Sequence, residues 1–186
     1  MDSSQTISKE KFLRELDFVK AFARTLDISP DKSRVSVVSF GGDPAPPSIA
    51  FEDYATIESL VRGIDVVPYM GGQKRLDKAL LSAARVLDKS RPDVNKFLVV
   101  VTDGKQPLGR EPLDEATRPL HELGVKVNVV GAGEKVDAVE LGKITSKPDD
   151  LFYSKSFEVL VRLVPVVFEQ LVSGKFTVIY KTENVP

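Results

Sequence analysis

Apolar side chains recur along this chain in two alternating patterns, one helical and one extended. In residues 8–26 they fall at spacings of three and four with charged residues between them, which predicts an amphipathic helix. The same spacing from Leu76 to Leu87 predicts a second strong helix after Gly71-Gly72. Shorter helical patterns are expected at residues 56–62, 113–123, 136–144 and 157–172.

The extended pattern is clearest in residues 96–102, a continuous apolar run that ends at Asp103-Gly104. Such a run is typical of a parallel strand buried on both faces. Further strands are expected at residues 34–40, 48–51, 126–130 and 151–153. Because strands and helices alternate, the fold class is α/β, a doubly wound, Rossmann-like, mostly parallel sheet with helices on both faces. In this class ligands bind at the carboxyl ends of the strands.

Composition adds mainly exclusions. The 186 residues fit a single domain, 1–186, and the formal net charge of −1 supplies no field that would attract nucleic acid. The absence of cysteine rules out disulfides and thiolate metal sites. No apolar run is long enough for a membrane span, and the polar residues after Met1 do not form a signal peptide, so neither is expected.

Three segments with polar residues follow one another along the chain: residues 2–6 (Asp-Ser-Ser-Gln-Thr) before the first helix, residues 69–80 around Gly71-Gly72, and residues 99–104. Taken singly, these are a helix cap, a glycine turn and a strand-end turn. Their joint order resembles the von Willebrand factor A family. Residues 112–127 and 150–152 are also similar to the extracellular-matrix members of that family, such as those of collagen VI.

The resemblance implies a metal-ion-dependent adhesion site at the top of the sheet, with Asp2, Ser4, Thr6 and Asp103 as ligands of Mg²⁺ or Mn²⁺. Mg²⁺ takes about six oxygen ligands, part of them water, so three loops can hold it and leave a position for a partner's carboxylate. Thr6 stands where the family has serine, and it keeps the hydroxyl oxygen.

A lysine departs further from the family pattern. Lys74 stands where the family has a threonine ligand, and a lysine brings three donors, no acceptor and a positive charge. Two placements are open: the side chain extends away from the site, or its ammonium substitutes for the cation beside Asp2 and Asp103. The loops around the site are expected to contact a partner through Tyr69, Met70, Gly72, Gln73, Lys74 and Lys105.

The resemblance also implies an apolar strand that leads into Asp2 in the middle of the sheet, whereas only Met1 precedes Asp2 here. Backbone groups left unpaired on the neighbouring strands would cost about 1–3 kcal/mol each. The run 176–180 (Phe-Thr-Val-Ile-Tyr) is the candidate to fill the gap, as in a circular permutation. The alternative places this run at a sheet edge, with the entry strand truncated and the domain unstable or paired with another chain.

The function expected from the resemblance is a non-enzymatic, extracellular protein-binding or adhesion module whose partner is a matrix or collagen-like protein bearing an acidic residue. A structural matrix domain without metal dependence is the first alternative. The second is a Mg²⁺-dependent phosphoryl-transfer or receiver-like domain, because carboxylates at the end of a parallel sheet also serve phosphate chemistry. The residues disfavour the second alternative, since the chain has no Walker loop and no acidic pair for a phospho-aspartyl nucleophile.

Overall fold

The computed structural model describes residues 1–42, 47–104 and 107–173. Its sheet has three parallel strands in the order β1-β2-β3, with Val99 of β1 opposite Asn128 of β2, and Val129 of β2 opposite Leu151 of β3. The strands are β1 (Phe97–Thr102), β2 (Lys126–Ala132) and β3 (Leu151–Ser154). The helices are α1 (Lys9–Ala23), α2 (Ile57–Asp65), α3 (Leu76–Asp88), α4 (Leu113–Glu122), α5 (Ala138–Gly142) and α6 (Val164–Ser173), with 3₁₀ turns η1 (Pro148–Asp150) and η2 (Phe157–Leu163).

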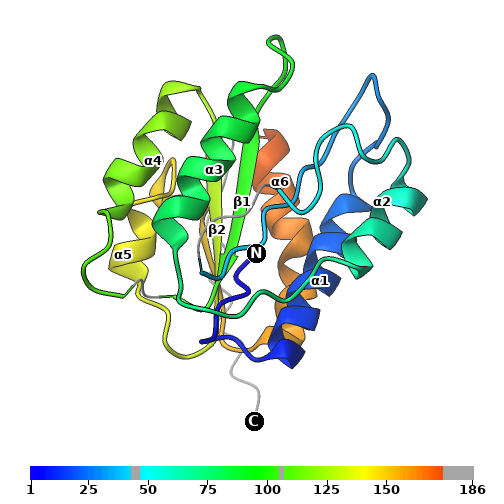
Figure 1. Ribbon diagram of the computed structural model, residues 1–186. Helices are drawn as coiled ribbons and strands as arrows, with labels where there is room; N and C mark the ends of the chain where they lie inside the picture. The colour runs from blue at the N-terminus through cyan, green and yellow to red at the C-terminus, as the bar shows by residue number, and fades with distance from the viewer. Residues whose placement is uncertain (43–46, 105–106, 174–186) are drawn as a thin grey trace.

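Helices cover both faces of this sheet, as Figure 1 shows. Helices α3, α4 and α5 pack on one face and enclose a core that includes Leu80, Leu120 and Val129. Helices α1 and α6 and the turn η2 pack on the other face around Phe12 and Val130, and α2 lies against α1. The doubly wound α/β architecture predicted from the alternating pattern is therefore confirmed.

Several element boundaries differ from the expectation. Residues 34–40 form no continuous strand but make two isolated bridges, Val37 with Ile49 and Phe40 with Asp2. The segment expected as one helix at 157–172 divides into η2 and α6, and Pro165 stands in the first turn of α6, where a missing N–H breaks no helical bond. The run 176–180 lies outside the described residues.

The side of β1 that faces away from β2 is paired differently. On this side the Asp2 N–H donates to the Val101 carbonyl at 3.1 Å, the one backbone hydrogen bond to β1 from residues 1–42, 47–104 and 107–173. The same residues bond to the 34–40 segment, since the Phe40 N–H donates to the Met1 carbonyl at 3.0 Å and the Ser3 N–H to the Phe40 carbonyl at 2.8 Å. Residues 1–3 thus bridge β1 and Phe40, and they place Asp2 at the carboxyl end of the sheet.

Among the described helices, none combines the length and the apolar character that crossing a membrane would require.

Candidate functional site

Backbone hydrogen bonds hold the first two of the three polar segments together. The Gln5 N–H donates to the Gly72 carbonyl, and the Gly71 N–H donates to the Ser3 carbonyl, both at 2.8 Å. A Cβ atom on Gly41 would lie 2.3 Å from the Gly71 oxygen and 2.6 Å from the Ser3 oxygen, so this close approach requires glycine. The glycine pairs at 41–42 and 71–72 therefore permit the loops to converge around the end of β1.

The carboxylate of Asp2 is the buried centre of the site. Its Oδ1 accepts from the backbone N–H and the hydroxyl of Ser4, at 3.1 and 2.7 Å. Its Oδ2 accepts from the Thr102 hydroxyl at 2.7 Å and lies 2.8 Å from the Lys74 Nζ. Since Asp2 has no exposed surface, these four contacts replace water as the partners of its charge.

The ammonium of Lys74 lies between the two carboxylates of the site. The Lys74 side chain is 1% exposed, and its Nζ forms ion pairs with Asp2 and with Asp103. It also donates to the Thr102 hydroxyl at 3.4 Å. Of the two placements left open by the sequence, the structure has the second: the lysine turns inward and its charge takes the position expected for a cation.

The remaining predicted ligands complete one connected set. The Ser4 hydroxyl lies 3.0 Å from the Thr6 hydroxyl, which donates to the Asp103 Oδ1 at 3.3 Å. The structure thus brings together Asp2, Ser4, Thr6 and Asp103, the four residues that the family resemblance implies for one site. Asp103 is the carboxylate nearer to solvent, with 20% of its side chain exposed.

Two buried ionisable side chains near the site have shifted pKa values. Burial alone would lower the pKa of Lys74, but the carboxylates of Asp2 and Asp103 outweigh it, and its pKa is raised above 10.5. Lys74 is thus an ammonium at neutral pH. On α1, burial raises the pKa of Glu15 well above 4.5, against a lowering by the nearby N-terminal ammonium. Its Oε2 accepts the Asp2 backbone N–H at 2.9 Å.

The residues predicted to contact a partner do not all face outward. Met70, Gly72 and Gln73 are exposed, as expected. Lys74 is buried, which corrects its assignment as a partner contact, because the two carboxylates hold it inside the site. Tyr69 is half-buried: its hydroxyl donates to the Ile7 carbonyl at 2.7 Å and its ring packs edge-on against Phe12. Lys105 lies outside the described residues.

Three residues of the site region had no role in the sequence interpretation: Thr102, Glu15 and Ser39. Thr102 links Asp2 to Lys74, and Ser39 donates to the hydroxyl of buried Ser3 at 2.9 Å. The available signals were a threonine at the end of a strand, just before Asp103, and a glutamate within the apolar face of the first helix. Neither stands at a spacing that identifies a site residue unless the fold is known.

The described side chains do not fit a divalent cation at the position that the family pattern implies. Lys74 offers no acceptor, and its ammonium forms ion pairs with Asp2 and Asp103, the two carboxylates that a cation would need. A cation there would meet a positive charge at close range in a buried site, where repulsion is strong. The arrangement instead provides an ammonium with several oxygen acceptors.

The profile of the von Willebrand factor type A domain matches residues 1–165, and the chain belongs to this family. Among curated relatives, the collagen alpha-4(VI) chain of Mus musculus is 28% identical over 176 residues, 94% of this chain and 7% of that protein. The von Willebrand factor A domain-containing protein 2 of Xenopus laevis is 31% identical over 137 residues, 72% of this chain and 17% of that protein. The chain thus spans a small part of the length of these relatives.

Solved structures show the same fold. A crystal form of proximal thread matrix protein 1 from the mussel byssus superposes with a TM-score of 0.84 at 25% identity, covering 91% of this chain and 46% of that chain. A second structure of that protein, with a zinc-occupied adhesion-site motif, gives a TM-score of 0.83 at 24% identity over 91% of this chain and 46% of that chain. At 24% identity, the likeness to this second structure shows a shared fold and no more.

Proposed function

We propose that residues 1–186 form a single, non-enzymatic protein-binding module of the extracellular-matrix type, in which the Lys74 ammonium takes the place of the adhesion-site cation. The observation that carries the proposal is the pair of ion contacts from Lys74 to Asp2 and Asp103. Relatives that include a collagen VI chain and a byssus matrix protein support the matrix setting and an extracellular location.

Replacing the cation with an ammonium changes the chemistry that the site offers to a partner. A bound Mg²⁺ keeps a coordination position that a partner's carboxylate can fill. An ammonium has three N–H donors, and Lys74 directs its own toward Asp2, Asp103 and Thr102. The formal charge of Lys74, Asp2 and Asp103 together is 1 − 2 = −1, which repels a carboxylate.

Recognition of a protein partner therefore falls to the exposed loop surface around the site, and a neutral or basic surface suits it better than an acidic one. Met70 is 44% exposed and Leu108 is 94% exposed, and apolar side chains at loop tips are common partner contacts. Gln73, in the same loop as Met70, accepts a hydrogen bond from Arg110, in the same loop as Leu108. The acidic, metal-bridged partner is the competing form of the same function.

The enzymatic alternative has less support. Within the described part of the chain, no three His, Cys, Asp or Glu side chains converge as a phosphoryl-transfer centre would need. The two carboxylates that do converge are both ion-paired with Lys74.

Thermal unfolding with Mg²⁺ or Mn²⁺ against EDTA tests the proposal. The wild-type Tm should be the same in both conditions. Lys74→Thr restores the family's threonine and should gain a metal-dependent rise in stability, about 2.7 kcal/mol at 100 times the Kd. Adding Asp103→Ala to that variant should abolish the gain. A metal-dependent rise in the wild type that Asp103→Ala removes would refute the lysine-occupied site and restore the acidic partner.

A further inference from the structure

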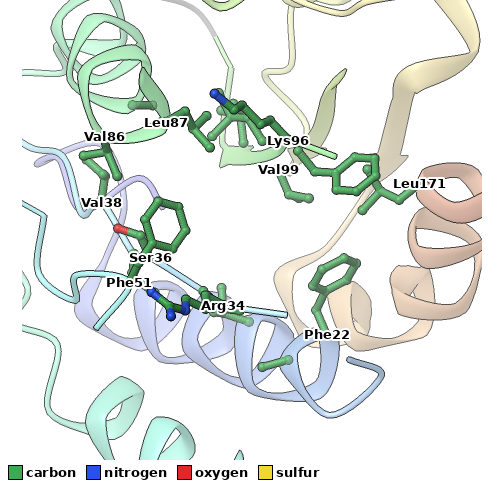
Figure 2. Close-up of a pocket in the computed structure, with 18 of the residues that line it drawn as sticks. Phe22, Arg34, Ser36, Val38, Phe51, Val86, Leu87, Lys96, Val99 and Leu171 are labelled. Atoms are coloured by element: carbon green, nitrogen blue, oxygen red, sulfur yellow. The ribbon is translucent and has the colours of Figure 1, made fainter. Parts of the chain in front are cut away.

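A cavity of about 530 Å³ lies between β1 and the 34–38 segment, and Met1 is part of its lining. Figure 2 shows Val99 of β1 across this space from Ser36 and Val38. Its walls come from both helical layers, since Phe22 of α1 and Leu171 of α6 line it together with Leu87 of α3. The cavity therefore lies at the level of the sheet itself, and we name it the strand slot.

One long edge of the strand slot is β1, and along the other edge the backbone hydrogen bonds of residues 37–40 alternate in side, as in an extended chain. In an extended chain, the N–H and C=O of one residue point to the same side and those of the next residue point to the other. The Lys96 carbonyl accepts from β2, whereas the Val101 carbonyl accepts from Asp2, so the backbone groups of Phe97 and Val99 face the slot. Among the described strands, β1 pairs with β2 alone, which leaves the edge that faces the slot without a described strand beside it.

The opposite edge alternates in the same way. Val37 exchanges both backbone hydrogen bonds with Ile49, on the side away from the slot. The Val38 carbonyl accepts from the Met1 nitrogen at 3.0 Å, on the side of the slot. The backbone groups of Ser36, two residues earlier, therefore also face the slot. Because Met1 and Asp2 bond to both edges, the gap at this end has the width of one strand.

We infer that residues 176–180 of the same chain occupy the strand slot as a parallel central strand. At about 3.3 Å per residue, a five-residue strand spans about 16 Å, and residues 97–100 of β1 beneath the Asp2 contact span about 13 Å. The sequence Phe-Thr-Val-Ile-Tyr consists of aromatic and β-branched residues. Apolar walls on both faces of the slot suit such a run, as for a parallel strand buried on both faces.

The connection also fits. Phe168, Leu171 and Val172 of α6 line the slot, so the helix that precedes the run ends beside it. Lys126, the first residue of β2, donates to the Gln170 carbonyl, which places this end of α6 at the start of the strands. Two residues, Gly174 and Lys175, then separate α6 from Phe176. Short connections are usual between a helix and a strand, and glycine favours the helix end.

A short tether favours the same chain over a second copy or a separate protein, because it gives the run a high effective concentration at the slot. The decisive measurement is amide hydrogen exchange on the full wild-type chain at several protein concentrations, with the mass in solution from light scattering. Amides 177–180 and those of Val99 and Ser36 should exchange at least about a hundred-fold more slowly than in an unstructured peptide, in a monomer and at every concentration.

Two matched variants add an independent readout. Val178→Asp places a charge in the middle of the run, and Val185→Asp makes the same change in the tail beyond it. The first should lower the Tm by about 10 °C and remove the protection of Val99 and Ser36, whereas the second should leave both unchanged. If Val178→Asp does not fold, the exchange pattern of the wild type decides alone.

Unstructured exchange of residues 177–180 in the wild type would overturn the inference, as would equal effects of the two variants. Protection that appears only in a dimer and is lost on dilution would also overturn it, and would assign the slot to a strand of a second copy.

Discussion

The gap between β1 and the 34–40 segment has two ends with opposite chemistry. At the site end, next to the carboxyl end of β1, residues 1–4 fill the space, and the charge of Asp2 is matched by Lys74 and by two hydroxyl groups. At the slot end lies the strand slot, lined mainly by apolar side chains of both helical layers. The site end is defined by specific polar contacts, and the slot end by the apolar volume that it encloses.

This difference predicts which substitutions each end tolerates. A buried ion pair is weak evidence for net stability, yet breaking it by removing one partner leaves an uncompensated charge and is costly. An apolar slot responds instead to changes in volume and to any charge introduced into it. Stability should therefore be sensitive to single polar atoms at the site end, and to side-chain size at the slot end.

The largest effect is expected for Lys74→Met, which keeps a long apolar stem and removes the charge. Asp2 and Asp103 would then face each other without a counter-ion, and the free energy of unfolding should fall by about 3–5 kcal/mol in chemical denaturation. Lys89→Met, at the exposed end of α3, is the matched control and should change stability by less than about 0.5 kcal/mol. Equal effects would mean that the inward ammonium adds nothing.

The next effect compares the slot with the fully packed core. Ala83 of α3 lines the slot, whereas Ala116 of α4 is completely buried away from it. Ala116→Leu should cost about 1–3 kcal/mol from overpacking in any form of the chain. Ala83→Leu should cost a similar amount in the full chain if residues 176–180 fill the slot as inferred. In a chain that ends at Gly174, it should be neutral or stabilising.

Chemical denaturation of both variants in both chain lengths, each compared with its own parent chain, measures this pattern. An Ala83→Leu variant that is equally tolerated with and without residues 175–186 would show that the slot is open in the full chain. The experiment thus separates the volume of the slot from the identity of its occupant.

The sequence predicted the fold well because the fold depends on patterns that are local. The apolar run of 96–102 and the helical face from Leu76 to Leu87 specify a buried strand and an amphipathic helix wherever they occur. The 34–40 segment was predicted as a strand, and the structure shows only isolated bridges there. Its β-branched residues suit a strand, but pairing depends on a neighbour that the local pattern does not specify.

The site was predicted in part for the same reason. The family resemblance grouped Asp2, Ser4, Thr6 and Asp103, and the structure places their side chains in contact. The direction of Lys74 could not be predicted, because it depends on the three-dimensional balance between burial of an ammonium and its attraction to two carboxylates. Thr102 was missed because a threonine at a strand end serves as a polar link only where a buried carboxylate lies beside it.

A smaller effect at the site end is expected for Thr102→Val, which keeps the shape of the side chain and removes its hydroxyl. The Asp2 Oδ2 would lose a donor at 2.7 Å, and stability should fall by about 1–2 kcal/mol. Thr117→Val is the matched control, because that buried hydroxyl donates to the Leu113 carbonyl within its own helix, where the backbone bond remains. Thermal unfolding should separate the two, and a larger loss for Thr117→Val would contradict the assigned role of Thr102.

The smallest effect concerns Glu15, whose Oε2 accepts the Asp2 N–H at the boundary between the two ends. Because burial raises its pKa well above 4.5, the folded state holds this proton at a pH where the unfolded chain has lost it. The slope of stability with pH is then negative, so Glu15 lowers stability progressively as the pH rises from about 4.5 toward its folded pKa.

Glu15→Gln keeps an acceptor for the Asp2 N–H and removes the titration. The variant should match the wild type near pH 4 and exceed its stability by about 1 kcal/mol at pH 8, as measured by urea unfolding across that range. Glu10→Gln, at the exposed start of α1, should show no such pH-dependent gain. A Glu15→Gln variant that loses stability at high pH would instead show that the ionised carboxylate, with its charge, holds residues 1–3 in place between β1 and Phe40.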